Sequence, residues 1–347
     1  MGYFNRIKKD DSLIKAMSRK INQKKISERT GTLINDRISK ASMCTLEKSY
    51  QYLIEQLSTP TRNYMLTSLQ KNTVTRGINP IINDYERGNQ PGIETNRLDD
   101  IVMSLLASAL SKKKGLKIIH FASIYEFIQG VKLYRNGTCI VRMGDEEDYI
   151  TGHYTAIEFR TLNDRPYILL YEPSFLQNTK EAGTDYGLQL LKKHAQYIYA
   201  KIGFIEVSTQ RSQDDCAIFS LFIANKFRTI KTFNDSIFNN MEQSDKKIIY
   251  YYERSNKHYI KNFEQKVALD VPAELLKHGH SLKSLSLRGD EIINSKGQSL
   301  SERAQKHAFQ SKEGRIYSTS IELKRISYYK EAMKYLGISD YDLETHC

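Results

Sequence analysis

Apolar residues repeat with two different spacings along the chain, and these spacings predict a mixture of helices and strands. A helical spacing, with an apolar residue at every third or fourth position, recurs at 45–57, 99–110, 123–131 and 184–200. Short runs rich in β-branched and aromatic residues, typical of strands, occur at 116–121, 138–142, 152–160, 167–171 and 202–207. We therefore expect an α+β fold in which helices flank a mixed central sheet.

Two of the predicted strands bring a histidine and a glutamate together. His153 begins the strand 152–160, and Glu172 closes the strand 167–171 just before Pro173, which ends strand pairing. In an antiparallel pair the start of one strand lies beside the end of the next, so a carboxylate there would hold the imidazole and raise its basicity. Taken singly, the two residues have plain alternatives: a surface histidine and a capping or solvated carboxylate.

A cysteine stands where a polar segment gives way to an apolar helix. The segment from Gln210 to Asp215 is polar, and apolar residues then recur at helical spacing over 216–227. Asp214 and Asp215 occupy the expected cap, so Cys216 falls in the first turn. There the positive end of the helix and a nearby imidazole would favour a nucleophilic thiolate. The alternative is that Cys216 is a small buried hydrophobe.

The cysteines indicate neither a metal site nor a disulfide framework. The four cysteines are Cys44, Cys139, Cys216 and Cys347, with no Cys-x-x-Cys pair and no Cys/His cluster at zinc spacing. We therefore expect no metal and a reducing compartment.

Composition favours a soluble, basic protein with an anionic partner. Hydrophobic residues make up 40% of the 347 positions, enough for a sizeable core, and a formal charge of +12 attracts nucleic acid, anionic membranes or phosphorylated small molecules. We find no stretch with the length and apolarity of a membrane span and no secretory signal peptide.

The first 40 residues differ in composition from the rest. Residues 1–40 carry eleven basic and four acidic side chains and few apolar ones, which predicts a flexible secretion or targeting leader, or simply a solvated tail. Met1-Gly2 would suit N-myristoylation, but Arg6 stands where that pattern needs Ser or Thr.

Taken together, the motifs resemble those of a known family. His153, Glu172 and Cys216 follow one another at separations of 19 and 44 residues, with Gln210 six residues before the cysteine. This order is similar to that of the SUMO-specific and adenovirus-type cysteine proteases. The fuller match, carried by Gly152-His-Tyr, Tyr171-Glu-Pro and residues 210–220, is to the YopJ/AvrRxv (HopZ-like) family of type III secreted effector acetyltransferases. Ala217 departs from the family's usual Gly, and Gly279-His280-Ser281 departs from its usual sequence after Lys-His.

The resemblance implies a catalytic triad on a cysteine-protease-like core. His153 would deprotonate Cys216, Glu172 would orient His153, and the Gln210 amide would join the Cys216 N–H in an oxyanion hole. An acetyl group would pass from acetyl-CoA through an acetyl-cysteine to Ser, Thr or Lys of host proteins. The protein would act in the host cytoplasm after type III secretion and would dampen immune signalling, with membrane contact left open.

The resemblance also implies activation by inositol hexakisphosphate. Residues 277–334 carry twelve basic and six acidic side chains, a balance that suits dense phosphate. The residues expected to bind inositol phosphate or CoA are Lys277, His278, Lys324 and Arg325, and Lys277 is the expected self-acetylation site. Each of them alone could equally lie on a solvated face.

These expectations divide the chain into four parts: a leader over 1–40, an N-terminal helical part of a regulatory region over 41–110, a catalytic core over 111–264, and the C-terminal part of the regulatory region over 265–347.

Two other functions stay open. One is a protease or deconjugase of ubiquitin-like modifiers with the same triad. The other is a nucleic-acid-binding protein, although no zinc finger, basic zipper or clear RNA-binding signature is present, so we expect no nucleic acid partner.

Overall fold

In the computed structural model, the described residues all belong to one compact unit, Gln51–Cys347. They are 75, 77–79, 81–82, 93–143, 153–174, 184–210, 212, 215–254, 263, 265–281, 285, 288–310 and 316–338. The expected leader 1–40, the expected helix 45–57 and Asp214 lie outside them.

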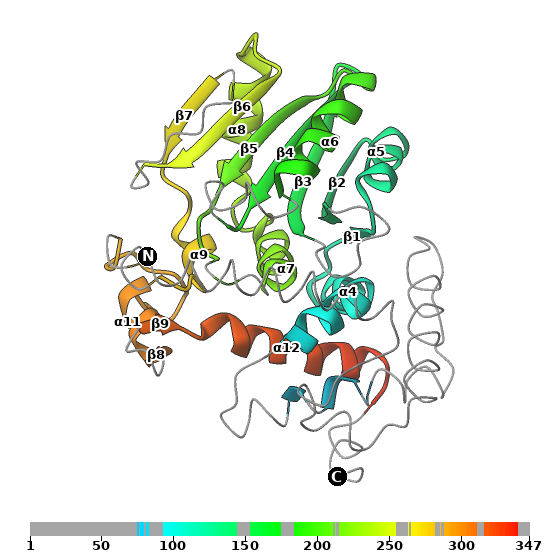
Figure 1. Ribbon diagram of the computed structural model, residues 1–347. Coiled ribbons are helices and arrows are strands. Elements are labelled where there is room, and N and C mark those ends of the chain that lie inside the picture. Colours follow the sequence, from blue (N-terminus) through cyan, green and yellow to red (C-terminus); the bar gives the residue numbers. More distant parts are fainter. Residues whose placement is uncertain are drawn as a thin grey trace, which may run out of the picture. The chain divides into compact units, whose positions relative to one another are not determined.

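Seven strands form one mixed sheet in which spatial order follows chain order (Figure 1). The strands are β1 (Ile118–Phe121), β2 (Asn136–Arg142), β3 (Tyr154–Leu162), β4 (Arg165–Glu172), β5 (Lys201–Glu206), β6 (Ile248–Glu253) and β7 (Gln265–Leu269). β2, β3 and β4 pair in antiparallel fashion, whereas β1 runs parallel to β2 and β4 to β7 run parallel to one another. The predicted α+β class with a mixed sheet is confirmed.

Eight helices are named within the described part of the chain. They are α4 (Ile93–Lys114), α5 (Ile124–Leu133), α6 (Thr184–Tyr197), α7 (Cys216–Lys226), α8 (Lys231–Gln243), α9 (Ala273–Leu276), α11 (Leu300–Lys306) and α12 (Ser320–Tyr335). The short strands β8 (Ala308–Gln310) and β9 (Ile316–Ser318) form a separate pair. Within this part of the chain, every helix is too short or too polar to span a bilayer.

The β3–β4 hairpin turns through two residues in left-handed conformation. Asn163 has φ 49° and Asp164 has φ 57°, and the flanking pair Leu162 and Arg165 are in register. Asn and Asp tolerate this conformation, and turns of this kind match the twist of the flanking strands. The two strands therefore form a hairpin, which places the start of β3 and the end of β4 at the same edge of the sheet.

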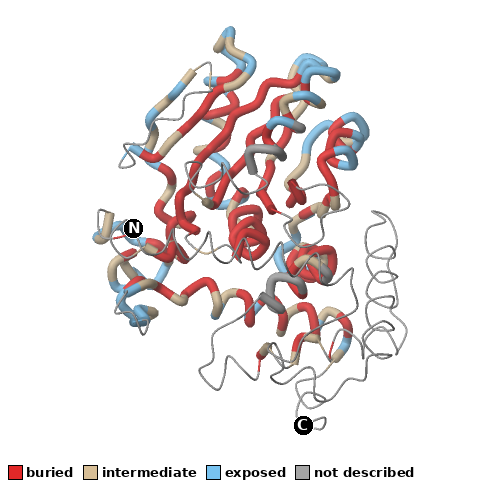
Figure 2. The backbone as a smooth tube through the Cα atoms, viewed as in Figure 1, coloured by how far each residue is buried: buried red, intermediate tan, exposed pale blue. Residues whose placement is uncertain are grey.

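Alternate residues of each strand supply two different hydrophobic cores. Ile168 and Leu170 on β4 pack with α5 and α6, whereas Leu169 and Tyr171 pack with α4, α7, α8 and α12. This is the two-residue period of a strand covered on both faces. Figure 2 shows the central strands buried along nearly their whole length.

Helix α7 is buried on every side. All residues from Cys216 to Ala224 are buried. The helix packs on β2, β3 and β4 and is covered by α4, α9 and α12. A helix that is apolar all round belongs in an interior. Cys216 therefore begins a helix that lies between the sheet and the α4–α12 pair (Figure 1).

One expected domain boundary falls inside a helix, and another falls between two paired strands of the same sheet. α4 runs through position 110, and β7 continues the sheet beyond position 264. The functional division into leader, regulatory region and catalytic core stays a prediction.

Candidate active site

His153 and Glu172 meet at the edge of the sheet where the hairpin places them. His153 immediately precedes β3, and Glu172 is the last residue of β4. The His153 Nε2 and Glu172 Oε2 atoms lie 2.8 Å apart. The Glu172 side chain is 0% exposed and that of His153 is 10% exposed, so water screens this contact little.

The second carboxylate oxygen of Glu172 is held by Ser174. Oε1 accepts hydrogen bonds from the Ser174 backbone N–H at 2.9 Å and from its hydroxyl at 2.6 Å. A buried carboxylate is costly unless its lone pairs find donors. Ser174 therefore supplies donors to this buried oxygen and fixes the plane of the carboxylate toward His153.

Cys216 is the first residue of α7, and its thiol hydrogen-bonds the His153 imidazole. Because Glu172 engages Nε2 of His153, Nδ1 is the ring nitrogen left to face the thiol. One turn further along α7, the Ser220 hydroxyl donates to the Tyr154 carbonyl at 2.9 Å. This bond joins the helix that begins with Cys216 to the strand that follows His153.

The surroundings favour the protonated form of His153. Burial by itself would lower the pKa of His153, but the charge of Glu172 and the hydrogen bonds to Cys216 and Glu172 outweigh burial and raise that pKa to about 10. An imidazolium beside a thiol stabilises the thiolate, which is the nucleophilic form. Cys139 is 0% exposed, and burial raises the pKa of its thiol well above the ordinary value.

Gln210 lies in the loop before α7 and is buried. Its backbone N–H donates to the Pro173 carbonyl at 2.8 Å, which ties this loop to the end of β4. Its side-chain Nε2 donates to the Ser212 carbonyl at 2.8 Å, and its Oε1 is buried with no hydrogen-bond partner. An amide nitrogen carries two protons, so one N–H remains for the expected oxyanion contact.

The N-cap residue of α7 is one of the two expected aspartates, but its side chain does not make the expected capping bond. This N-cap residue is Asp215. Its carboxylate instead receives the Arg325 guanidinium, with Asp215 Oδ1 and Arg325 Nη2 2.5 Å apart. A long-range ion pair has displaced the local bond that the sequence pattern predicts.

Basic side chains from four helices and from the residue that follows α9 gather near the far end of α7. We call them the cation cluster, whose members are Lys113, Lys114, Lys226, Lys277, Arg303 and Lys324. Burial, followed by the charges of Lys114, Lys277, Lys113 and Lys226, lowers the pKa of Lys324 to about 8. Burial, Arg303 and Lys226 likewise lower the pKa of Lys277. Cations that lower one another's pKa form a site that favours an added anion.

The four expected ligand residues thus have different surroundings. Lys277 and Lys324 belong to the cation cluster. His278 is buried beside it, with Nδ1 2.7 Å from the Ser320 hydroxyl, and burial together with nearby cations lowers its pKa well below the usual value. The Arg325 guanidinium is surrounded by carboxylates and is 1% exposed, an environment that favours a structural role.

A model of the YopJ serine/threonine acetyltransferase family matches residues 74–331. The chain belongs to this family. It is an acetyltransferase, and the resemblance drawn from the three motifs is confirmed. Members of the YopJ family are type III secreted effectors that act in host cells.

Individual relatives agree with the family model. The chain is 24% identical to the serine/threonine-protein acetyltransferase YopJ of Yersinia pestis over an alignment of 207 residues. This alignment covers 58% of this chain and 67% of YopJ. The fold is similar to that of an AvrA deletion variant solved with IP6 and CoA, with a TM-score of 0.58 and 20% identity over 76% of this chain and 98% of AvrA. It is also similar to that of HopZ1a in complex with IP6, with a TM-score of 0.62 and 17% identity over 84% of this chain and 98% of HopZ1a.

Sequence reasoning missed several residues of this site. Ser174 follows directly after Glu172-Pro173, and Ser220 is a polar residue within an apolar helix one turn after Cys216. Both positions could have been recognised from the sequence. Lys114, Lys226 and Arg303 carry no such signal, because only the packing of their helices brings them to one place.

Proposed function

We propose that this YopJ-family acetyltransferase carries the acetyl group on Cys216 and transfers it to Ser, Thr or Lys of host proteins. The observation that carries this proposal is the buried His153–Glu172 pair, hydrogen-bonded to a cysteine at the start of a helix. These groups have the residue types, order and contacts that a thiolate nucleophile requires.

The first half-reaction forms a thioester. The Cys216 thiolate attacks the acetyl carbonyl of acetyl-CoA, and the oxyanion that develops accepts hydrogen bonds from the Cys216 N–H and the second amide N–H of Gln210. The bond from carbonyl carbon to CoA sulfur then breaks, and His153 gives its proton to the leaving thiolate. Acetyl-Cys216 and free CoA result.

The second half-reaction passes the acetyl group to the acceptor. His153, now neutral, takes the proton of an acceptor hydroxyl or amine as that group attacks the thioester carbonyl. The Cys216 thiolate leaves, and Glu172 stabilises the imidazolium that forms. Glu172 needs a fixed position in both halves, and its bonds to Ser174 supply it.

The cation cluster is proposed to hold inositol hexakisphosphate as an activator. Support comes from the cluster's lowered pKa values and from the similarity of the fold to AvrA and HopZ1a structures that contain IP6. Lys277, Lys324 and the buried His278 were expected at this site, and Lys114, Lys226 and Arg303 extend it. Phosphates of CoA would also need basic groups, and a structure of HopZ1a with both IP6 and CoA supports room for two anionic ligands on this fold.

Lys277 is proposed as the site of self-acetylation. Burial, Arg303 and Lys226 lower the pKa of Lys277, which raises the fraction of neutral amine that can attack a thioester. The host acceptor proteins, a dampening of immune signalling and any contact with a membrane belong to the same proposal.

The decisive experiment is the intact mass of the full-length protein after incubation with acetyl-CoA, with and without inositol hexakisphosphate, beside Cys216→Ala. Mass increments of one acetyl each are expected, increased by the inositol phosphate and absent in Cys216→Ala. Increments that persist in Cys216→Ala would contradict an acetyl-cysteine intermediate. Cys139→Ala is the matched control, because this buried cysteine lies in the core with α5 and α6.

The same triad could also cleave peptide bonds, since both reactions are acyl transfers. A fluorogenic substrate ending in Gly-Gly, incubated without acetyl-CoA, separates the two activities. No Cys216-dependent cleavage is expected, and rapid cleavage would favour a deconjugase.

A further inference from the structure

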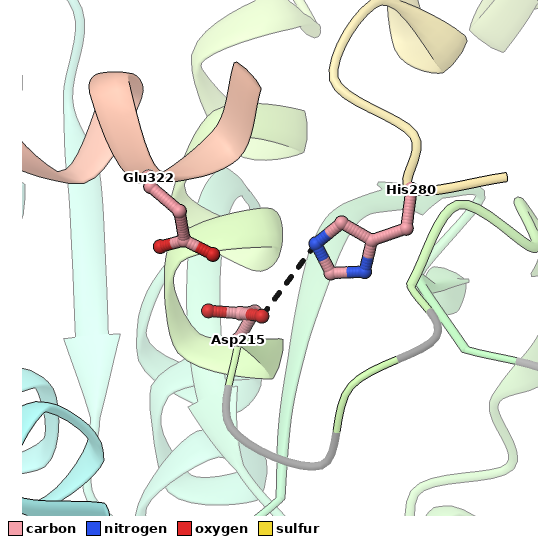
Figure 3. A group of neighbouring side chains, drawn as sticks. All are labelled: Asp215, His280 and Glu322. Atoms are coloured by element: carbon pink, nitrogen blue, oxygen red, sulfur yellow. Dashed lines mark ion pairs between the residues drawn. The ribbon is translucent and has the colours of Figure 1, made fainter. Parts of the chain in front are cut away.

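Three ionisable side chains from distant parts of the chain converge beside the start of α7 (Figure 3). Asp215 directly precedes Cys216, His280 follows α9, and Glu322 lies in the first turn of α12. One ligand atom from each lies within 4.8 Å of the others. In the described part of the chain, this grouping has a spacing that could suit a metal ion.

A guanidinium already stands among these carboxylates. Arg325 Nη2 lies 2.5 Å from Asp215 Oδ1, and Arg325 Nη1 hydrogen-bonds Glu322. A divalent cation bound by the same two carboxylates would face this permanent positive charge at close range. The group is therefore an ion-pair network in which a cationic side chain already occupies the space between the carboxylates, and it carries no metal proposal.

Arg325 also reaches a third element. Its Nε lies 3.0 Å from Asp99 Oδ2 on α4, and Asp99 Oδ1 accepts a hydrogen bond from the Tyr329 hydroxyl at 2.5 Å. Arg325 is 1% exposed and Asp99 is 0% exposed. One buried side chain of α12 thus contacts α4, its own helix and the residue before Cys216.

The surroundings keep Asp215, the member of the network next to Cys216, ionised. Burial opposes ionisation of Asp215, but Arg325, His280 and Ser212 outweigh burial and hold the pKa of Asp215 below its usual value. Burial raises the pKa of Asp99 to about 6, although Arg325 and Tyr329 favour its charged form. The contact between Asp215 and Arg325 is therefore the firmly charged link.

This link takes the place of the usual helix cap. An N-cap aspartate ordinarily bonds N–H groups of its own helix, but the Asp215 carboxylate is turned to Arg325, Ser212 and His280. The start of α7 is thus located by helix α12 and not by its own capping bond.

We propose that Arg325 is a positioning residue for Cys216 that acts through Asp215. By holding Asp215, it sets where α7 begins and keeps the Cys216 thiol against His153. The inference rests on the proposed function in one respect, since it takes Cys216 as the nucleophile. Lys324 of the cation cluster directly precedes Arg325 on α12. An anion bound by Lys324 would therefore contact the same turn of α12 that holds Asp215.

The test measures the reactivity of the Cys216 thiol directly, without acetyl-CoA. Full-length protein is alkylated with iodoacetamide between pH 5.5 and 9.5, and peptide mass spectrometry resolves Cys216 from the other cysteines. A thiolate paired with an imidazolium is alkylated faster at neutral pH than an unpaired thiol. If Cys216 of the parent were alkylated at pH 7 no faster than Cys216 of His153→Gln, the proposed triad itself would be contradicted, which separates that failure from failure of the positioning role.

Two variants probe the link from its two ends. Arg325→Lys keeps the charge but cannot reach Asp215, Asp99 and Glu322 together. Asp215→Asn keeps the shape of the side chain and leaves Arg325 paired with the other two carboxylates. In both we expect alkylation of Cys216 at pH 7 to fall at least about fivefold relative to the parent.

Asp215→Asn is the sharper variant, because loss of a negative charge beside a thiolate would by itself increase reactivity. A fall can therefore come only from lost position, and an unchanged or faster reaction in a folded Asp215→Asn protein overturns the proposal. Arg288→Lys is the matched control, because Arg288 is also largely buried and pairs with Glu253 and Glu291. Its Cys216 profile should equal that of the parent.

Discussion

The Ser220 hydroxyl donates a hydrogen bond of 2.9 Å to the carbonyl oxygen of Tyr154, the residue that follows His153. Ser220 is 0% exposed and lies one turn after Cys216 on α7. The bond therefore joins the two elements that carry the nucleophile and its base. Neither residue contacts a reacting atom in the proposed reaction, yet the pair sets the distance over which the thiol and the imidazole meet.

Replacing Ser220 should weaken this joint without removing a catalytic group. In Ser220→Ala we expect a loss of about 1 kcal/mol in the free energy of unfolding, typical of one buried hydrogen bond, and a fall in kcat of roughly 3–10-fold. Urea unfolding and steady-state kinetics measure the two effects. Ser236→Ala is the control, because the Ser236 hydroxyl bonds the Phe233 carbonyl on α8. An unchanged kcat in Ser220→Ala would show that packing alone places α7.

Loss of the Ser174 hydroxyl should lower kcat without weakening the binding of acetyl-CoA. Ser174→Ala keeps the backbone N–H donor to Glu172 but removes the 2.6 Å hydroxyl contact. A hydrogen bond to a charged group is worth about 1.5–3 kcal/mol, so a fall of roughly tenfold in kcat is expected, with KM nearly constant.

Ser174→Thr restores the hydroxyl and should recover most of that kcat. Ser108→Ala, which removes a hydroxyl bonded to the Ser104 carbonyl within α4, serves as the control. If Ser174→Thr is as slow as Ser174→Ala, the hydroxyl is not what holds Glu172.

The raised pKa of His153 predicts a pH dependence of stability. Its folded pKa of about 10 lies above the ordinary 6.5, so the folded state holds a proton that the unfolded chain has lost between these values. The stability that protonated His153 contributes is therefore complete below pH 6.5 and is lost as pH rises toward 10.

The comparison of the parent with His153→Gln isolates this contribution. The difference in their free energies of unfolding should be largest near pH 6 and should shrink steadily up to pH 9.5, as followed by urea unfolding at each pH. A difference that grows with pH would mean that His153 is neutral in the folded protein.

The charge of Lys324 should cost stability in the absence of an anion. Its folded pKa of about 8, lowered by burial and by neighbouring lysines, lies below the ordinary 10.5. The charged form is therefore disfavoured in the folded state, most fully below pH 8, and this cost fades as pH rises toward 10.5.

Lys324→Met should accordingly raise the Tm of the ligand-free protein at pH 7, by an amount on the order of 2–4 °C. It should also reduce the further rise in Tm that inositol hexakisphosphate produces. Thermal unfolding with and without the inositol phosphate measures both. Lys296→Met, at an exposed position, should change neither. A lower Tm in ligand-free Lys324→Met would mean that the side chain stabilises the fold through packing.

The sequence by itself determined the local features of this protein. Strand and helix periods place β3, β4 and α7 within one or two residues of their observed limits, because these elements are buried and their apolar patterns are strong. The Asn163-Asp164 turn determines the hairpin, and the hairpin in turn brings His153 beside Glu172. The order of three short motifs was enough to indicate the family.

Only the tertiary structure decided the contacts between residues far apart in the chain. The capping pattern predicts a local bond for Asp215, yet its carboxylate pairs with Arg325, 110 residues away. The sequence grouped Arg325 with the residues expected to bind inositol phosphate or CoA, and the structure shows its side chain buried among carboxylates. Lys226 lies in the cation cluster without any sequence signal. Periodicity shows which face of an element is buried but not which element covers it, so long-range ion pairs follow from helix packing and cannot be derived from spacing.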